Sequence, residues 1–315
     1  MASPPRGPPT DTQPLTGQVI LITGATSGLG RASALALARL SPAHIYISGR
    51  RASAADAVIA EISTLTSGAV RATFLPIDLA DLASVVSAAE TVLARETKLD
   101  VLLANAGIAA APPARTKDGY EVHFGTNHVG HALLATKLMP LLEACNGRVV
   151  SVSSFAFRAA FWGIPLEAKG IKCKGKGDGT GWGAGIGDYF VLWRWLRYAE
   201  SKLANVVYAR ELAKRHPGVV SVSVCPGFVE TEILSSMRFC DQWLTRAMGL
   251  FAGGGMVSTE EGALNQIWVA TVDKDELTNG AVYDPVGVML VGAAQDPALG
   301  EQLWEWTDKE ISSWL

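Results

Sequence analysis

Short, almost continuously apolar runs recur along the chain from residue 17 onward. They read QVILITG, HIYISG, ATFLPID, DVLLANAG, RVVSVSS, VVSVSVCPG and GAVYDPVG. Most of them lack the alternation of a half-exposed strand, which is typical of strands buried on both faces. Helical patterns such as GRASALALARL, AADAVIAEIS and LASVVSAAETVLA separate the early runs. This alternation predicts an α/β fold built on a doubly wound parallel sheet.

The N-terminal residues stand apart from this pattern. Residues 1–16 are rich in proline and contain no apolar run, so we expect a disordered leader rather than a signal peptide. The chain shows no internal repeat. Residues 17–315 are therefore expected to form a single domain.

Two segments interrupt the alternation of strands and helices. Residues 155–188 are glycine-rich without a clear period, and we expect them to form an insert. Residues 232–271 look like helices inserted before the last strand, on the substrate side. The last twenty residues predict a helix with Leu299, Leu303, Trp306 and Ile311 along one side.

Composition and charge narrow the function classes. Of the 315 residues 49% are hydrophobic, and 27 Lys and Arg stand against 30 Asp and Glu. This near balance gives no general attraction to nucleic acid. No run of about 18 apolar residues predicts a membrane span, and the four widely spaced cysteines indicate reduced thiols. We therefore expect a soluble, cytoplasmic protein.

A glycine-rich turn follows the first predicted strand. In TGATSGLG, Gly24, Gly28 and Gly30 lie where the strand gives way to a helix. Glycines there permit tight turning, and they let a pyrophosphate approach the free N–H groups at the helix N-terminus. The position of the turn predicts a dinucleotide site.

Tyr198 and Lys202 stand four residues apart in RYAESK and would share one face of a helix. A phenol titrates near pH ~10, and a neighbouring ammonium favours the phenolate and lowers the pKa. The pair therefore predicts a general acid/base with a lowered pKa. Ordinary packing of the ring on the lysine stem is the alternative that the pair alone leaves open.

The GxxxGxG spacing and the Tyr-x-x-x-Lys pair together resemble the short-chain dehydrogenase/reductase family. GYEVHFGTNHVGHALL, YAESKLANVVYARELA and CPGFVETEI resemble its retinol-dehydrogenase-like branch. The resemblance covers about residues 17–290 and implies a Rossmann-type fold. It also implies an oxidoreductase that interconverts a hydrophobic alcohol and its ketone or aldehyde. Retinoid-, steroid- or polyketide-like substrates, and a place in secondary metabolism, fit this expectation.

The resemblance implies which residues bind the cofactor. An acidic residue at Gly49 would select NAD in this family, but here Arg50 follows at once, which favours NADP(H). Ser27 stands where some NADP enzymes have a second basic residue, and Ala104 replaces the first asparagine of the family's Asn-Asn-Ala-Gly. The implied cofactor-binding residues are Gly24, Ser27, Gly28, Leu29, Gly30, Arg50, Asp78, Asn105, Tyr198, Lys202, Val229 and Thr231.

The implied catalytic residues are Ser154, Tyr198, Lys202 and Asn127. Ser154 would donate a hydrogen bond to the substrate oxygen, with Ser153 as an outside candidate. Asn127 matches the family asparagine that helps hold a water in a proton relay toward the lysine. His123, His128 and His131 lie close by in sequence, but no carboxylate or cysteine completes a zinc set at the usual spacing, so no metal is expected.

Several alternatives stay open from sequence alone. The same residues would serve the reduction of an activated C=C bond, and a non-catalytic NADP-binding regulator is a further alternative. Nine aromatic residues lie between Ser154 and Tyr198 and predict a lid over a hydrophobic substrate; completion of the core or peripheral membrane contact would also explain them. The chain is expected to act as a monomer or a homodimer, because the helix that bears the tyrosine often forms a dimer interface in the family.

Overall fold

The computed structural model describes residues 14–160, 162–166, 171–172, 191–229, 256–292 and 296–315. Within them, seven parallel strands form one sheet in the order β3-β2-β1-β4-β5-β6-β7. The strands are β1 (Val19–Ile22), β2 (His44–Gly49), β3 (Arg71–Pro76), β4 (Val101–Ala104), β5 (Arg148–Val152), β6 (Val220–Val224) and β7 (Val282–Tyr283). Each lies within or overlaps one of the seven apolar runs. The strand order reverses between β1 and β4, which makes the sheet doubly wound and confirms the predicted fold class.

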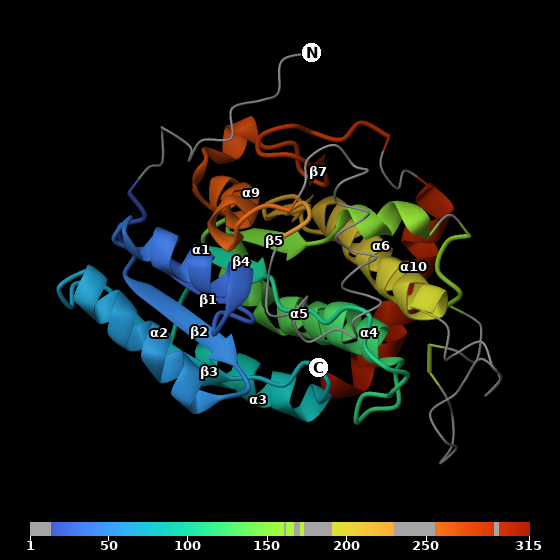
Figure 1. Cartoon of the computed structure of the whole chain (residues 1–315), viewed down its shortest axis with the longest axis horizontal. Coiled ribbons are helices and arrows are strands. Elements are labelled where there is room, and N and C mark those ends of the chain that lie inside the picture. The colour runs from blue at the N-terminus through green and yellow to red at the C-terminus, as the bar shows by residue number, and fades with distance from the viewer. Residues whose placement is uncertain (1–13, 161, 167–170, 173–190, 230–255, 293–295) are drawn as a thin grey trace.

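Helices cover both faces of the sheet (Figure 1). One face carries α1 (Gly28–Ala38), α2 (Ala52–Leu65) and α9 (Thr259–Thr271), and the other carries α3 (Leu82–Leu93), α5 (Gly130–Glu143) and α6 (Val191–Arg215). The C-terminal α10 (Pro297–Ile311) packs against α6. Although α9 is far from α1 in the sequence, the two helices lie side by side.

Short helical turns complete the described elements. They are α4 (Val122–Phe124), a π-helical turn at Gly125–Val129, and 3₁₀ turns at Phe155–Ala159, Lys274–Glu276 and Ser312–Trp314. The π-helical turn runs directly into α5 at Gly130. Such turns are rare and occur frequently at functional sites.

Polar side chains at the helix N-termini explain where several helices begin. Asp81 precedes α3 and accepts a hydrogen bond from the backbone N–H of Ala83. Ser258 and Glu261 form a reciprocal capping box at the start of α9. Asp296 caps α10 in the same way as Asp81 caps α3. Each such cap stabilises its helix by about 1 kcal/mol.

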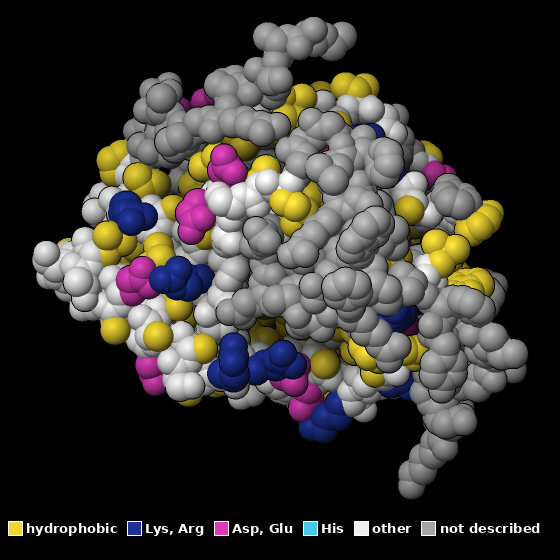
Figure 2. Space-filling model, viewed as in Figure 1, with side chains coloured by type: hydrophobic (Ala, Val, Ile, Leu, Met, Phe, Trp, Pro, Cys, Tyr) yellow, Lys and Arg dark blue, Asp and Glu magenta, His cyan; other side chains and the backbone are white. Residues whose placement is uncertain are grey.

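Charged side chains of both signs are interspersed with hydrophobic ones on the face shown in Figure 2. This distribution agrees with the near balance of charges in the sequence. Within the described part of the chain, no helix is both long enough and apolar enough to cross a membrane.

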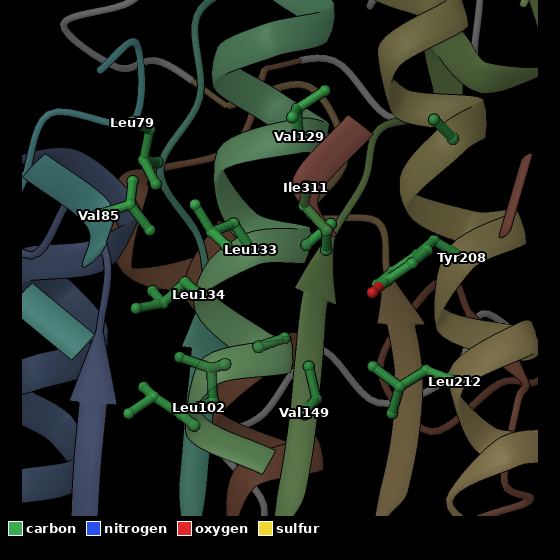
Figure 3. Close-up of a cluster of buried hydrophobic side chains, with 14 of the residues drawn as sticks. Leu79, Val85, Leu102, Val129, Leu133, Leu134, Val149, Tyr208, Leu212 and Ile311 are labelled. Atoms are coloured by element: carbon green, nitrogen blue, oxygen red, sulfur yellow. The ribbon is translucent and has the colours of Figure 1, made fainter. Parts of the chain in front are cut away.

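The core lies in two layers, one on each side of the sheet. Successive residues of β1 serve the two layers in turn: Val19 and Leu21 pack toward α3 and α5, and Ile20 and Ile22 pack toward α1 and α2. Figure 3 shows the first layer, where side chains from α3, β4, α5, β5, α6 and α10 converge. The four apolar residues predicted on one side of the C-terminal helix all pack in this layer.

The insert between Ser154 and Tyr198 is anchored where the structure describes it. Phe157 and Ile171 are buried in the core layer beneath α6. Lys172 forms a β-bridge with Tyr120, and its ammonium pairs with Glu310 on α10. Residues 173–190 lie outside the described residues, as does most of the segment predicted to form a lid.

The other two predicted segments are described only in part. Residues 1–13 of the predicted leader lie outside the described residues, and Leu15, near its end, is buried and bonded through its N–H to Leu40. Residues 230–255 also lie outside them. The remainder of the 232–271 segment contains α9, which packs on α1 and covers one face of the sheet. None of the residues of α9 lines the cavity described below.

Candidate active site

A large cavity opens at the carboxyl ends of the strands. Its volume is about 710 Å³, and its walls come from the turns that follow β1, β2, β3, β4, β5 and β6, together with the first half of α6. Parallel sheets of this kind bind ligands at this edge, beside the point where the strand order reverses. The sequence-predicted residues can therefore be placed by their position around one cavity.

The glycine turn forms the wall between β1 and α1. Gly24 and Gly28 have φ values of 65° and 51°, in the left-handed region that glycine adopts without strain. Gly30 does not line the cavity; a Cβ there would collide with the carbonyl oxygen of Gly24, so glycine permits the close packing of turn and helix. Ser27 and Leu29 line the cavity, where the N-terminus of α1 presents its N–H groups.

The end of β2 supplies the next part of the wall, through Gly49, Arg50 and Arg51. Both arginine side chains are exposed toward solvent at the cavity edge. A Cβ at Gly49 would lie 2.8 Å from the Cγ2 of Thr26, so the glycine turn and the end of β2 are in close contact. Asp78, after β3, also lines the cavity, and its Oδ1 accepts a hydrogen bond of 3.0 Å from the N–H of Ala80.

The turn after β4 is tied to the turn after β1. The side-chain Nδ2 of Asn105 donates to the carbonyl oxygen of Thr23 at 2.8 Å, and its Oδ1 accepts from Gln266 at 3.3 Å. Asn105 therefore supports the strand ends and also lines the cavity. At Gly107 a Cβ would lie 3.2 Å from the Oδ1 of Asn127 and 3.3 Å from the Nζ of Lys202, so glycine lets these two side chains approach the turn closely.

Asn127 lies in the π-helical turn and is fully buried. Its side-chain oxygen accepts from the N–H of Ile108 at 2.9 Å, and its Nδ2 donates to the carbonyl of Ile108 at 3.0 Å and to Ser201 Oγ at 2.9 Å. Ser201 in turn donates to the backbone oxygen of Tyr198 at 2.7 Å. Asn127 thus joins the cavity wall at Ile108 to the helix that carries the tyrosine.

The two serines after β5 have different surroundings. Ser153 is buried, and its Oγ donates to the carbonyl oxygen of Lys202 at 2.8 Å. Ser154 lines the cavity close to the phenol of Tyr198, and its Oγ accepts a hydrogen bond of 3.2 Å from the N–H of Ala156. Of the two candidates, Ser154 is the one placed beside the tyrosine.

Tyr198 and Lys202 lie on α6 as the spacing predicted, with Tyr198 in the cavity wall. The Nζ of Lys202 is 5.8 Å from the centre of the tyrosine ring and donates to the carbonyl oxygen of Val152 at 2.8 Å. The ring of Tyr198 also meets the edges or faces of Trp195 and His123, at centroid distances of 5.8 and 6.4 Å. The site is therefore enclosed by aromatic and charged groups.

The pKa of Tyr198 corrects one expectation from the sequence. Burial raises the pKa of its phenol to about 12, and the neighbouring hydroxyl of Ser154 opposes this rise without cancelling it. Burial also lowers the pKa of the Lys202 ammonium to about 8. The sequence predicted a lowered tyrosine pKa because it revealed the nearby charge but not the loss of hydration that both groups undergo.

Comparisons with known proteins agree with this arrangement. A family model described as short chain dehydrogenase matches residues 18–165. Human retinol dehydrogenase 11 is 32% identical to the chain over 303 residues, which cover 94% of this chain and 86% of the human protein. A short-chain dehydrogenase/reductase of Armillaria gallica is 31% identical and covers 96% of this chain and 93% of its own. The chain belongs to the short-chain dehydrogenase/reductase family.

Its relatives place this short-chain dehydrogenase/reductase in the retinol-dehydrogenase-like branch, as the motifs predicted. Among solved structures, a protein from Mycobacterium paratuberculosis superimposes with a TM-score of 0.68 at 26% identity and covers 96% of both chains. The similarity therefore extends over nearly the whole chain, including the region of α6 that carries Tyr198.

The three histidines of this dehydrogenase/reductase that lie near Asn127 all have partners in the fold. His123 bonds Glu121 and the N–H of Ala111, and His128 bonds Thr307 on α10. His131 bonds Thr23 and the carbonyl of Asn127. Among the described residues, no group of three or more potential metal ligands comes together.

Some residues of the site escaped sequence reasoning. Arg194 is only 5% exposed and lines the cavity one helical turn before Tyr198, and Phe228 lines it as well. The spacing from Arg194 to Tyr198 was readable as i, i+4, but nothing in the sequence showed that this helix face meets a cavity. Val229 lines the cavity as predicted, whereas Thr231 lies outside the described residues.

Proposed function

We propose that this enzyme uses NADP(H) to interconvert a hydrophobic alcohol and its ketone or aldehyde. The observation that carries the proposal is the convergence of Ser154, Tyr198, Lys202 and Asn127 beside a cavity that also contains the glycine turn. Hydride transfer needs both a nucleotide-binding wall and an acid/base pair. The cofactor carries the hydride, and the protein positions the substrate and polarises its carbonyl group.

The residues present fit NADP(H). The glycine turn and the N-terminus of α1 offer N–H groups to a pyrophosphate, and Arg50 stands beside Gly49, where no carboxylate would repel a 2′-phosphate. We assign Asp78 to the adenine end and Val229 to the nicotinamide end, in line with the family pattern. When bound, the cofactor supplies or accepts the hydride.

The chain's own groups then handle the proton. With a pKa of about 12, Tyr198 is protonated at neutral pH and can donate its proton to a carbonyl oxygen that gains negative charge. Ser154 lies beside Tyr198 in the cavity wall, where its hydroxyl can donate a second hydrogen bond to the same substrate oxygen. With a pKa of about 8, Lys202 is mostly charged at pH 7 and stabilises negative charge on the tyrosine oxygen.

The substrate end of the cavity has a mainly apolar lining. Val122, Phe155, Trp195 and Phe228 contribute there, and Phe155 remains 38% exposed. Large aromatic surfaces suit a flat or extended hydrophobic substrate of the retinoid, steroid or polyketide type. Arg194 adds one cationic group to this lining.

A substrate screen tests the proposal. The purified chain is mixed with NADPH and, in separate reactions, all-trans-retinal, a steroid ketone, an aromatic polyketide ketone or a conjugated enone, while absorbance at the NADPH band is followed. We expect consumption of NADPH with at least one carbonyl compound, and product analysis then separates C=O from C=C reduction. NADPH binding without turnover of any substrate in either direction would favour a non-catalytic regulator instead.

Cofactor choice gives a separate prediction. Replacing Arg50 by alanine should raise the KM for NADPH about 10- to 100-fold and change that for NADH by less than about threefold, because a charge-assisted phosphate contact is lost. Arg51→Ala is the matched control, since both arginines are exposed at the same edge. Equal effects of Arg50→Ala on the two cofactors, or a larger effect of Arg51→Ala, would contradict the assignment.

A further inference from the structure

His131 stands between the two halves of the site without touching the cavity. It lies one turn after Asn127 in α5 and is only 7% exposed. Its Nε2 is 2.9 Å from Thr23 Oγ1, and its Nδ1 is 2.9 Å from the carbonyl oxygen of Asn127. One ring therefore connects the nucleotide side of the site, at the end of β1, with the π-helical turn that carries Asn127.

The partners of Thr23 determine which ring nitrogen carries the proton. Thr23 Oγ1 accepts two hydrogen bonds of 3.0 Å, from the backbone N–H groups of Asn105 and Ala106. Both of its lone pairs are then used, so its own proton must be donated. The nearest acceptor is His131 Nε2 at 2.9 Å, whereas the carbonyl of Leu103 is 3.4 Å away.

The Asn127 side of the ring leads independently to the same proton position. A carbonyl oxygen can only accept, so His131 Nδ1 must be the donor at that contact. The ring is therefore neutral, with its proton on Nδ1 and its lone pair on Nε2. Burial and the charge of Lys202 lower the pKa of His131 to about 4, which agrees with a neutral ring at physiological pH.

We propose that His131 is a positioning residue that holds Asn127, and through it Tyr198, in register with the turns after β1 and β4. The path is continuous: Thr23 donates to His131, His131 donates to Asn127, and the Asn127 side chain binds Ile108 and Ser201. Ser201 donates to the backbone of Tyr198. The inference rests on the proposed function, because it assigns a role to a contact between the cofactor wall and the acid/base.

Two substitutions separate the two ends of the connection. In His131→Asn the amide can occupy the place of Nδ1 and keep the bond to Asn127, but it does not reach Thr23. In His131→Gln the amide reaches the place of Nε2 and keeps the bond to Thr23, but it gives up the bond to Asn127. His131→Leu removes both bonds. His128→Leu is the matched control, because His128 is also buried, lies on the preceding turn and bonds Thr307 instead.

Two measurements distinguish the variants: the Kd for NADPH by nicotinamide fluorescence, and kcat with all-trans-retinal. We expect each single-bond variant to change one of the two quantities and not the other. We expect His131→Asn to weaken NADPH binding about 10-fold with kcat near wild type. His131→Gln should lower kcat about 10-fold with Kd near wild type, His131→Leu should do both, and His128→Leu neither. A purely structural histidine would instead lower the melting temperature in all three His131 variants without this split.

Nuclear magnetic resonance of the ¹⁵N-labelled full chain gives a readout that needs no substrate. In a long-range ¹H–¹⁵N spectrum, the His131 ring should show the pattern of a neutral ring protonated on Nδ1 between pH 6 and 8. The His131 signals are assigned as those that disappear in the His131→Asn variant. A ring protonated on Nε2, or equal effects of the Asn and Gln variants on Kd, would overturn the inference. If wild-type protein fails to bind NADPH, the proposed function fails, and the spectrum still decides the protonation of the ring.

Discussion

Replacing Tyr198 by phenylalanine is expected to lower kcat by about 10²- to 10⁴-fold while the Kd for NADPH stays within about threefold of wild type. The variant keeps the aromatic ring, and with it the contacts to Trp195 and His123, and removes only the hydroxyl group. In the proposed mechanism that hydroxyl acts mainly in the transition state, where it gives its proton to the substrate oxygen. Steady-state kinetics and fluorescence titration with NADPH measure the two quantities.

Tyr208→Phe is the matched control for this experiment. Tyr208 is buried on the same helix and its hydroxyl contacts Thr136, away from the large cavity. Loss of its hydroxyl group should leave kcat unchanged. Substantial turnover by Tyr198→Phe, with a normal response of the control, would assign the acid/base to another group.

Replacing Lys202 by methionine should separate activity from stability. Lys202 is 3% exposed, and removal of its ammonium takes away both the charge beside Tyr198 and the group we assign to the nicotinamide ribose. We therefore expect a fall in kcat of about 10²-fold or more and weaker NADPH binding. Methionine fills a similar volume without a buried charge, so the folded protein should be at least as stable as wild type at pH 7.

The difference in stability between Lys202→Met and wild type should depend on pH. Burial lowers the pKa of Lys202 from 10.5 to about 8, so between these values the unfolded chain binds more protons than the folded one. The destabilisation by the buried charge is fully present below about pH 8 and disappears as the pH rises toward 10.5. The stability advantage of Lys202→Met should therefore shrink over that range in denaturant titrations.

Lys214→Met serves as the control, because Lys214 lies further along α6, is half-exposed and pairs with Glu211. It should leave kcat unchanged and show no comparable pH trend. A Lys202→Met protein that retains wild-type kcat would remove Lys202 from the proposed mechanism. A Lys202→Met protein that is much less stable at pH 7 would show that the bond to Val152 outweighs the desolvation of the charge.

Sequence patterns predicted the sheet well because buried parallel strands are continuously apolar over lengths that only a strand explains. Each of the seven runs contributes a strand, and Gly24, Gly28 and Gly30 meet steric conditions that only glycine satisfies. The i, i+4 spacing of Tyr198 and Lys202 was sufficient to place both on one helix. These features depend on short-range geometry, which a sequence displays directly.

The features that sequence reasoning did not find depend on burial and on contacts between distant segments. His128 meets a threonine 179 positions away, and His131 meets Thr23 across 108 positions, so neither partner is visible as a motif. The pKa of Tyr198 could not be predicted because the balance between charge and desolvation is set by depth in the folded chain. Arg194 was missed for the same reason, since its helix face acquires a cavity only in the fold.

The close contact between Gly49 and Thr26 constrains how the cofactor preference of this chain can change. An acidic side chain at position 49 would need a Cβ that lies 2.8 Å from the threonine methyl group. An acidic residue here, which the family resemblance associates with NAD, is therefore disfavoured until the side chain at position 26 becomes smaller or rotates away. In evolution or in a mutant library, the order of the two changes therefore matters. A smaller side chain at position 26 would have to come first, because an acidic side chain at position 49 alone collides with Thr26.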